Sequence, residues 1–294
     1  MRPLLVLSLV ALAAAPPAPA ADVKLPGGYT LEAAPVDPNA AKIVLVGGSN
    51  YFKAGEHDYL AGVAVLADLL KQTPGVAPVI AADWPTKAET FANAKAVVLF
   101  VDGGAKHAVL KGNRAAEVQK LVDAGVGLVQ LHQVADYPKD FGERARAWAG
   151  GSWEAGTGQR AHWVHEFKTF PDHPVTRGVT PFKIDDGWLF KNTFVAGKAG
   201  VTPLLRTVNP KGKDKEADDG AIVAWAYERP GGKGRSFTFT GAHLHASFAE
   251  EGYRRVLVNG ILWSAGREVP TTGAPVALDA AKLPTYLTPP PAKK

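Results

Sequence analysis

In the first half of the chain, short runs of apolar, mostly β-branched residues alternate with segments whose apolar residues recur at helical spacing. Residues 42–47 (KIVLVG) form such a run and end in glycine, which is typical of a buried parallel strand. Residues 58–72 place apolar side chains three and four positions apart before Pro74-Gly75, which predicts a helix that stops there. This alternation predicts an α/β fold with an open, mostly parallel, doubly wound sheet. The same patterns predict strands at 76–81, 94–101 and 126–131 and a helix at 113–124.

The second half of the chain is less regular. Residues 231–234 (GGKG) indicate a turn, and residues 253–264 (YRRVLVNGILWS) have the apolar face of an amphipathic helix. Residues 42–266 contain no internal repeat and no long linker, so we expect one domain. Its second half is expected to add strands at 161–169, 202–208, 221–227 and 235–240.

The two ends differ from this segment in composition. Arg2, an apolar run over residues 4–15 and Ala18-Pro19-Ala20 together have the form of a cleaved signal peptide (residues 1–20). That run is shorter than the ~20 residues that cross a bilayer, so we expect a periplasmic or secreted protein, cut after Ala20, with no membrane insertion. Residues 21–41 are expected to form a linker or loose arm, and the Pro-rich residues 267–294 an extended tail.

Composition narrows the chemistry. The chain has 294 residues, 46% of them hydrophobic, which suffices for a packed core. It contains no cysteine, which excludes disulfides, thiolate metal sites and cysteine nucleophiles. The formal net charge is +5, but basic residues are interleaved with acidic ones, as in residues 211–219 (KGKDKEADD). Nucleic-acid binding is therefore not expected.

Polar residues gather just after the predicted strands, where open α/β sheets bind their ligands. Four of the eight histidines fall at such positions, and this coincidence is the strongest chemical signal in the sequence. These histidines are His57, His132, His243 and His245, and they are accompanied by Asn50, Tyr51, Asp102 and Gln133.

His132 occupies the strand-to-helix position at which a hydrolase of this class would carry a serine, yet no G-x-S-x-G motif is present. An imidazole there can act as a general base, a proton donor or a metal ligand. His243 and His245 lie two residues apart, so on an extended segment both would point to one side and suit a metal ion. The alternative is a loop with one histidine facing the core and the other facing solvent.

Neighbouring carboxylates occur in residues 185–188 (DDGW). On an extended segment Asp185 and Asp186 point in opposite directions, so at most one of them faces a given site; a solvated turn is the alternative. His165 is expected to face the cleft, but not as a ligand partner of His162. Tryptophans at predicted loops or element ends would suit stacking on sugar rings if exposed, and core packing otherwise. They are Trp84, Trp148, Trp153 and Trp188.

Several segments, in this order, resemble the trehalose-utilisation (ThuA-like) family. Residues 125–133 (GVGLVQLHQ) are similar to its Gly-Gly-Gly-Leu-Val-Gly-Leu-His segment, residues 172–178 (DHPVTRG) to its His-Pro-Ile/Val-x-x-Gly segment, and residues 253–266 (YRRVLVNGILWSAG) to its ending. The resemblance implies a flavodoxin-like fold of the class I glutamine amidotransferase group, with helices on both faces, and a sugar-related role. Two departures are the extra His245 and Asp186 in place of the family's Glu.

We therefore hypothesise an exported enzyme of disaccharide or keto-sugar catabolism that uses His132, His243 and Asp186 in acid–base chemistry. It cannot be a glutamine amidotransferase because the thiol is missing. A divalent metal, if one is bound, would be held by the same three side chains, which suit zinc or manganese. The alternative is a non-catalytic sugar-binding or scaffold protein of an exported complex. The expected substrate-binding residues are Asn50, Tyr51, His57, Asp102, Gln133, His165, Trp188 and His245.

Overall fold

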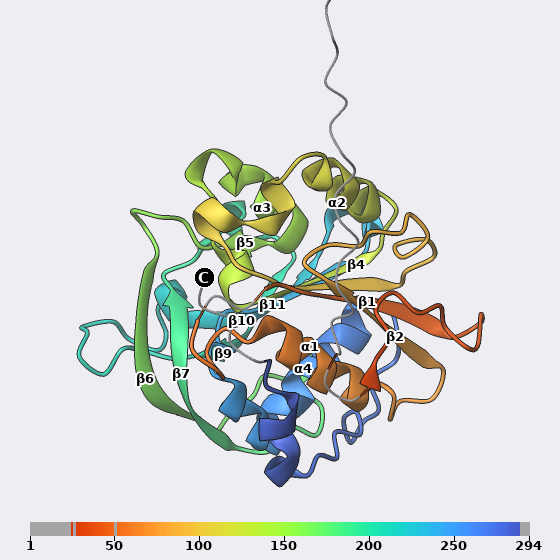
Figure 1. Ribbon diagram of the computed structural model, residues 1–294. Coiled ribbons are helices and arrows are strands. Elements are labelled where there is room, and N and C mark those ends of the chain that lie inside the picture. The colour runs from red at the N-terminus through yellow and green to blue at the C-terminus, as the bar shows by residue number, and fades with distance from the viewer. Residues whose placement is uncertain (1–24, 26–27, 50–51, 289–294) are drawn as a thin grey trace, which may run out of the picture.

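The computed structural model describes residues 25, 28–49 and 52–288. A seven-stranded sheet with the order β2-β1-β3-β4-β11-β10-β9 runs through the molecule (Figure 1). The strands from β2 to β11 pair in parallel, and β10 and β9 extend the sheet in antiparallel fashion. The order of the parallel part is that of a flavodoxin-like sheet, so the predicted fold class is confirmed. The strands are β1 Ala41–Gly47, β2 Val76–Ala82, β3 Ala96–Phe100, β4 Gly127–Leu131, β9 Val201–Arg206, β10 Ile222–Glu228 and β11 Arg235–Phe239.

The parallel strands bury both of their faces, which explains why they are continuous apolar runs rather than alternating ones. In β1, Ile43 and Leu45 point into one core cluster, whereas Val44 and Val46 point into a second cluster on the other face. Side chains alternate along a strand, so one apolar run supplies both cores.

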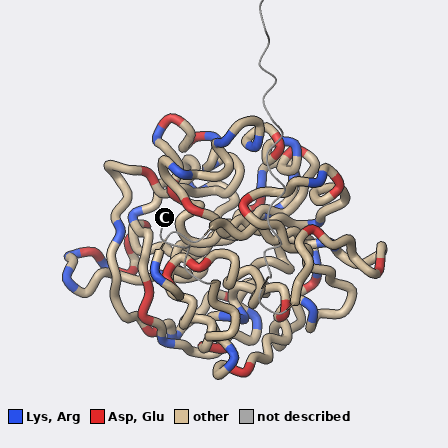
Figure 2. The backbone as a smooth tube through the Cα atoms, viewed as in Figure 1, with Lys and Arg blue, Asp and Glu red and all other residues tan. Residues whose placement is uncertain are grey.

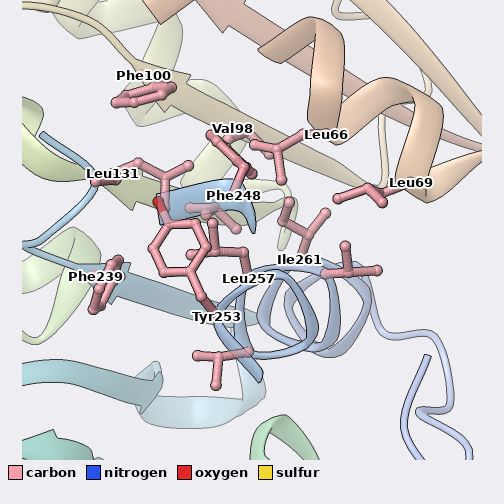
Figure 3. Packing of buried hydrophobic residues seen from close by; sticks show 14 of the residues in the cluster. Leu66, Leu69, Val98, Phe100, Leu131, Phe239, Phe248, Tyr253, Leu257 and Ile261 are labelled. Carbon is pink, nitrogen blue, oxygen red and sulfur yellow. The ribbon is translucent and has the colours of Figure 1, made fainter. Parts of the chain in front are cut away.

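Helices cover both faces of the sheet. Helices α1 (Tyr59–Leu70) and α4 (Glu251–Ser264) pack on the larger cluster, and α2 (Arg114–Asp123) and α3 (Gly142–Ala149) on the smaller one. Figure 3 shows side chains of α1 and α4 meeting those of the sheet in the larger cluster. The residues labelled there are Leu66, Leu69, Val98, Phe100, Leu131, Phe239, Phe248, Tyr253, Leu257 and Ile261.

Two long strands, β6 (Gln159–Phe167) and β7 (Phe182–Phe190), pair with each other in a separate antiparallel ribbon. They lie side by side at one edge of the molecule in Figure 1. The apolar pattern predicts β6 but not β7, because Asp185-Asp186-Gly187 interrupts the apolar run of β7. The solvated turn considered for this segment is therefore wrong. A minor pair, β5 (Gly151–Ser152) with β8 (Thr193–Phe194), and helix α3 were also not predicted.

Where the expected arm and tail are described, both contact α1. The Tyr29 and Tyr286 hydroxyls each donate to the Asp68 carboxylate at 2.5 Å. Residues 280–286 form a 3-10 helix, and its Leu283 is buried in the larger cluster. The few apolar residues of these Pro-rich segments are enough to anchor them to the core. The predicted signal peptide and its cleavage site lie outside the described residues.

Charged side chains are interspersed over the surface. Figure 2 shows Lys and Arg alternating with Asp and Glu around the periphery of the molecule in that view. Of the helices that the structure describes, none combines the length and the apolar character needed to cross a bilayer.

Candidate active site

Three loops meet at the carboxyl edge of the sheet, and each contributes one histidine. His57 precedes α1, His132 directly follows β4, and His243 lies in the loop after β11. The ring centroid of His57 lies 4.8 Å from that of His132 and 4.2 Å from that of His243. One ring nitrogen of each residue lies within 4.8 Å of the corresponding nitrogens of the other two. Three of the four histidines predicted at strand ends therefore form one buried group, here called the histidine cluster.

The backbone at the histidine cluster is strained. The φ angles are +49° at His57, +59° at His132 and +73° at Ala242, a region that costs residues with a Cβ of the order of 1 kcal/mol or more each. Two backbone hydrogen bonds join the first and third loops, from the His57 amide to the His243 carbonyl and from the His245 amide to the Gly55 carbonyl, both at 2.9 Å. Strain concentrated around one group of side chains is typical of functional sites.

Hydrogen bonds direct nitrogen lone pairs into the cluster. His132 Nδ1 lies 3.1 Å from the Thr240 carbonyl oxygen, which can only accept, so Nδ1 carries the hydrogen and Nε2 the lone pair. His132 is 3% exposed, and its Nε2 has no hydrogen-bond partner within the described part of the chain. His57 Nε2 and His243 Nδ1 are 2.8 Å apart, a contact that has room for one hydrogen between two nitrogens.

The three imidazoles are neutral at neutral pH. Burial, together with the neighbouring His243 and His162, lowers the pKa of His57 to about 3. Burial and His162 lower the pKa of His243 to about 4. The pKa of the fully enclosed His132 lies well below its usual 6.5, first because of burial and then because of His57 and His243. All three side chains are therefore available as proton acceptors or as ligands.

Of the predicted set His132, His243 and Asp186, the structure brings the two histidines together with His57 and leaves Asp186 outside the cluster. Its carboxylate accepts hydrogen bonds from the amides of Ala242, His243 and Leu244 at 3.0, 2.8 and 3.2 Å. Burial raises its pKa to about 6, although these amides act in the opposite direction. Asp186 is thus a positioning residue that fixes the loop carrying His243. Its neighbour Asp185 is exposed, as the alternation along β7 requires.

A cavity of about 310 Å³ lies over the cluster, within the size range of small-molecule sites. Gly187 forms part of its wall, because a Cβ there would lie 2.9 Å from both His162 Cε1 and His243 Cγ. Arg160, paired with Asp136 at 3.0 Å, also lines it. The remaining lining residues are Phe52, His57, His132, Gln133, Ala161, His162, Trp188, Leu189 and His243.

Some of the predicted substrate-binding residues line the cavity and others do not. Gln133 lines the cavity, with its amide nitrogen 3.4 Å from His57 Nε2. Asp102 stands further back, where it accepts from the Tyr59 hydroxyl at 3.4 Å. His245 is buried against Phe248, outside the cavity lining. Asn50 and Tyr51 lie outside the described residues.

The expected position of His165 over the cleft is wrong. On β6, His162 faces the histidine cluster, whereas His165 lines a different cavity next to Phe167 and Arg206. The four tryptophans considered for sugar stacking are buried, and of these four only Trp188 lines the cavity. His162 and Arg160 were not predicted as site residues. Both lie on β6, and the pairing of β6 with β7, which was not predicted, brings them to the cavity.

Comparisons with known proteins agree with this architecture. Two ThuA-like proteins of known structure are similar, one from Parabacteroides merdae (14% identity, TM-score 0.57, covering 84% of this chain and 99% of that chain) and one from Bacteroides uniformis (17% identity, TM-score 0.56, covering 83% and 98%). Curated proteins give no match. The family profile ThuA, described as trehalose utilisation, matches residues 43–264. The chain therefore belongs to the ThuA family.

Proposed function

We propose that this ThuA-family protein is an exported enzyme of carbohydrate catabolism that binds a disaccharide or keto-sugar in the cavity over the histidine cluster. The observation that carries the proposal is the convergence of three buried, neutral imidazoles on one cavity at the carboxyl edge of the sheet. A family associated with trehalose utilisation makes a sugar the natural substrate class. Export rests on the signal-like residues 1–20.

His132 is the proposed general base. Its Nδ1–H donates to the Thr240 carbonyl, which fixes the ring and leaves the Nε2 lone pair for a substrate proton. His57 and His243 lie beside it and supply a hydrogen-bond donor or acceptor to the reacting oxygen. This set suits proton transfer at a hydroxyl, at a carbon next to a keto group, or at a water molecule.

Recognition of the sugar falls to the rim of the cavity. The Arg160 guanidinium carries five N–H donors in a rigid fork, and its ion pair with Asp136 holds it in place. It also lies over the Trp153 ring, 4.3 Å from the ring centroid. Gln133 adds an amide that can both donate and accept. Hydroxyl groups of a sugar are suitable partners for both side chains.

The test is turnover of trehalose, other disaccharides and their keto derivatives by the purified protein, followed by chromatography of the products. His132→Ala is expected to lower turnover by about 10²-fold or more, because it removes the proton acceptor. His165→Ala is the matched control, since this histidine lines a different cavity, and its turnover should equal that of the wild type. Full activity of His132→Ala would refute the proposal. Sugar binding without turnover in the wild type would favour the non-catalytic alternative.

A further inference from the structure

We infer that His57, His132 and His243 form a binding site for one divalent transition-metal ion of the zinc class, with an open coordination position toward the cavity. The inference rests on the proposed function for the role of that open position. Metal binding itself is measured without a sugar, so the two ideas fail separately.

The geometry of the nitrogens is the first argument. A metal held by imidazoles at 2.0–2.1 Å in tetrahedral geometry requires ligand nitrogens about 3.3 Å apart. In the histidine cluster, one nitrogen of each residue lies within 4.8 Å of the other two, and His57 Nε2 and His243 Nδ1 are 2.8 Å apart. Small side-chain movements would bring the three nitrogens to this spacing around one ion.

Unsatisfied hydrogen-bonding capacity is the second, independent argument. His132 Nε2 is buried without a partner, whereas buried polar atoms in proteins almost always have one. Its other nitrogen donates to a backbone carbonyl, which is the arrangement that orients metal-binding histidines. A metal ion would satisfy this lone pair and would take the place of the hydrogen bond between His57 Nε2 and His243 Nδ1, which lie 2.8 Å apart.

The donor set identifies the class of metal. Three imidazoles suit zinc, copper, nickel or iron, whereas magnesium and calcium prefer oxygen ligands. The nearby Asp186 carboxylate is occupied by backbone amides and does not complete the set. Three protein ligands leave one position of a tetrahedral ion for an exchangeable group, which is the pattern of catalytic rather than structural zinc sites. With the ion bound, the His132 Nε2 lone pair would be a metal ligand rather than a proton acceptor, and a water molecule or sugar hydroxyl in the open position, with its pKa lowered by the metal, would supply the base instead.

The test uses the purified protein without an affinity tag, stripped with chelator and titrated with Zn²⁺ by calorimetry. One Zn²⁺ per chain is expected, and Mg²⁺ under the same conditions should give no heat. His57→Ala, His132→Ala and His243→Ala should each weaken Zn²⁺ binding by at least about 100-fold. His165→Ala is the control, because this histidine lines a different cavity, and its affinity should lie within threefold of the wild type.

Circular dichroism and urea midpoints establish that each variant is folded. If His132→Ala does not fold, the His132→Asn variant, which keeps a polar side chain at this position, is used in its place. Absence of Zn²⁺ binding to the wild type, or wild-type affinity in a folded His132 variant, would overturn the inference. Turnover of a sugar by the chelator-treated protein would support the proposed function without the metal. Binding of Zn²⁺ without turnover of any sugar in the panel would support the metal site and count against the proposed function.

Discussion

Removing the Asp186 carboxylate should destabilise the protein far more than removing its neighbour. Asp186 is fully buried in β7, and its two oxygens hold the three successive amides of Ala242, His243 and Leu244. The Ser247 hydroxyl donates to it at 3.3 Å as well. In Asp186→Ala these groups lose their acceptor while they remain enclosed. The loop that carries His243 then loses these anchors and keeps its backbone hydrogen bonds to residues 55–57.

The expected loss of unfolding free energy is about 4 kcal/mol. Leaving a buried donor without a partner costs about 1–3 kcal/mol, and four amides are affected, since the Gly187 amide also donates to the carboxylate, at 2.8 Å. Water that enters the space vacated by the carboxylate recovers part of this cost, so a value toward the low end of the combined range is appropriate. Asp186→Asn retains one acceptor oxygen and should lose about 2 kcal/mol. Since domains are stable by about 5–15 kcal/mol, both variants should remain folded in the absence of denaturant.

Urea unfolding at pH 7.5, followed by circular dichroism, measures this loss. Asp185→Asn is the matched control, because it changes the adjacent but exposed carboxylate and should alter stability by no more than about 0.5 kcal/mol. A loss below about 1 kcal/mol in Asp186→Ala would refute the view that this carboxylate positions the loop. Equal losses in the Asp185 and Asp186 variants would refute it too.

Three further predictions concern stability. Because the folded-state pKa values of His57 and His243 lie below the usual 6.5, at about 3 and 4, the unfolded chain binds more protons than the folded chain once the pH falls below about 6.5. The urea midpoint should therefore decrease from pH 7 to pH 4, and a midpoint that rises on acidification would contradict these shifts. Asp68→Asn weakens two hydrogen bonds to tyrosine hydroxyls, so it should cost about 2 kcal/mol and speed proteolysis near residues 280–286, whereas unchanged proteolysis would show that the tail is anchored elsewhere. Leu257→Ala in α4 leaves a cavity in the larger core cluster and should cost about 2–5 kcal/mol by urea unfolding; a loss under 1 kcal/mol would mean that the core repacks.

The sheet could be predicted from the sequence because its strands are buried on both faces. Such strands appear as short continuous apolar runs, and the runs at 42–47, 94–101 and 126–131 match β1, β3 and β4 to within two residues at each end. The helices α1 and α4 follow from their spacing of apolar residues. Strand β7 could not be found in this way, because Asp186 interrupts its apolar pattern in order to bind a distant loop.

The position of the site could be predicted, but not its membership. Parallel strands bring their carboxyl ends to one edge, and this alone placed His57, His132 and His243 near each other. Which side chain takes which part depends on loop conformations that have no sequence pattern, such as the positive φ of His57 and Ala242. Asp186 was therefore exchanged with His57 in the predicted ligand set.

The sequence also left open which large side chains are buried and which face the cavity. Trp148 and Trp188 were expected at loops or element ends, where either exposure or packing was open, and both proved to be at most 1% exposed. His165 and His162 are indistinguishable by residue type, and only the pairing of β6 with β7 decides which one faces the cluster. Such choices are made by tertiary contacts rather than by local pattern.

The central claim is that a sugar binds against the histidine cluster. Imidazole NMR signals test it most directly, once assigned with one histidine variant at a time. During titration with trehalose and its keto derivatives, the ring signals of His57, His132 and His243 should shift together and saturably, while those of His165 stay unchanged. Unchanged signals from the three clustered histidines across the whole panel, or shifts confined to His165, would contradict the account.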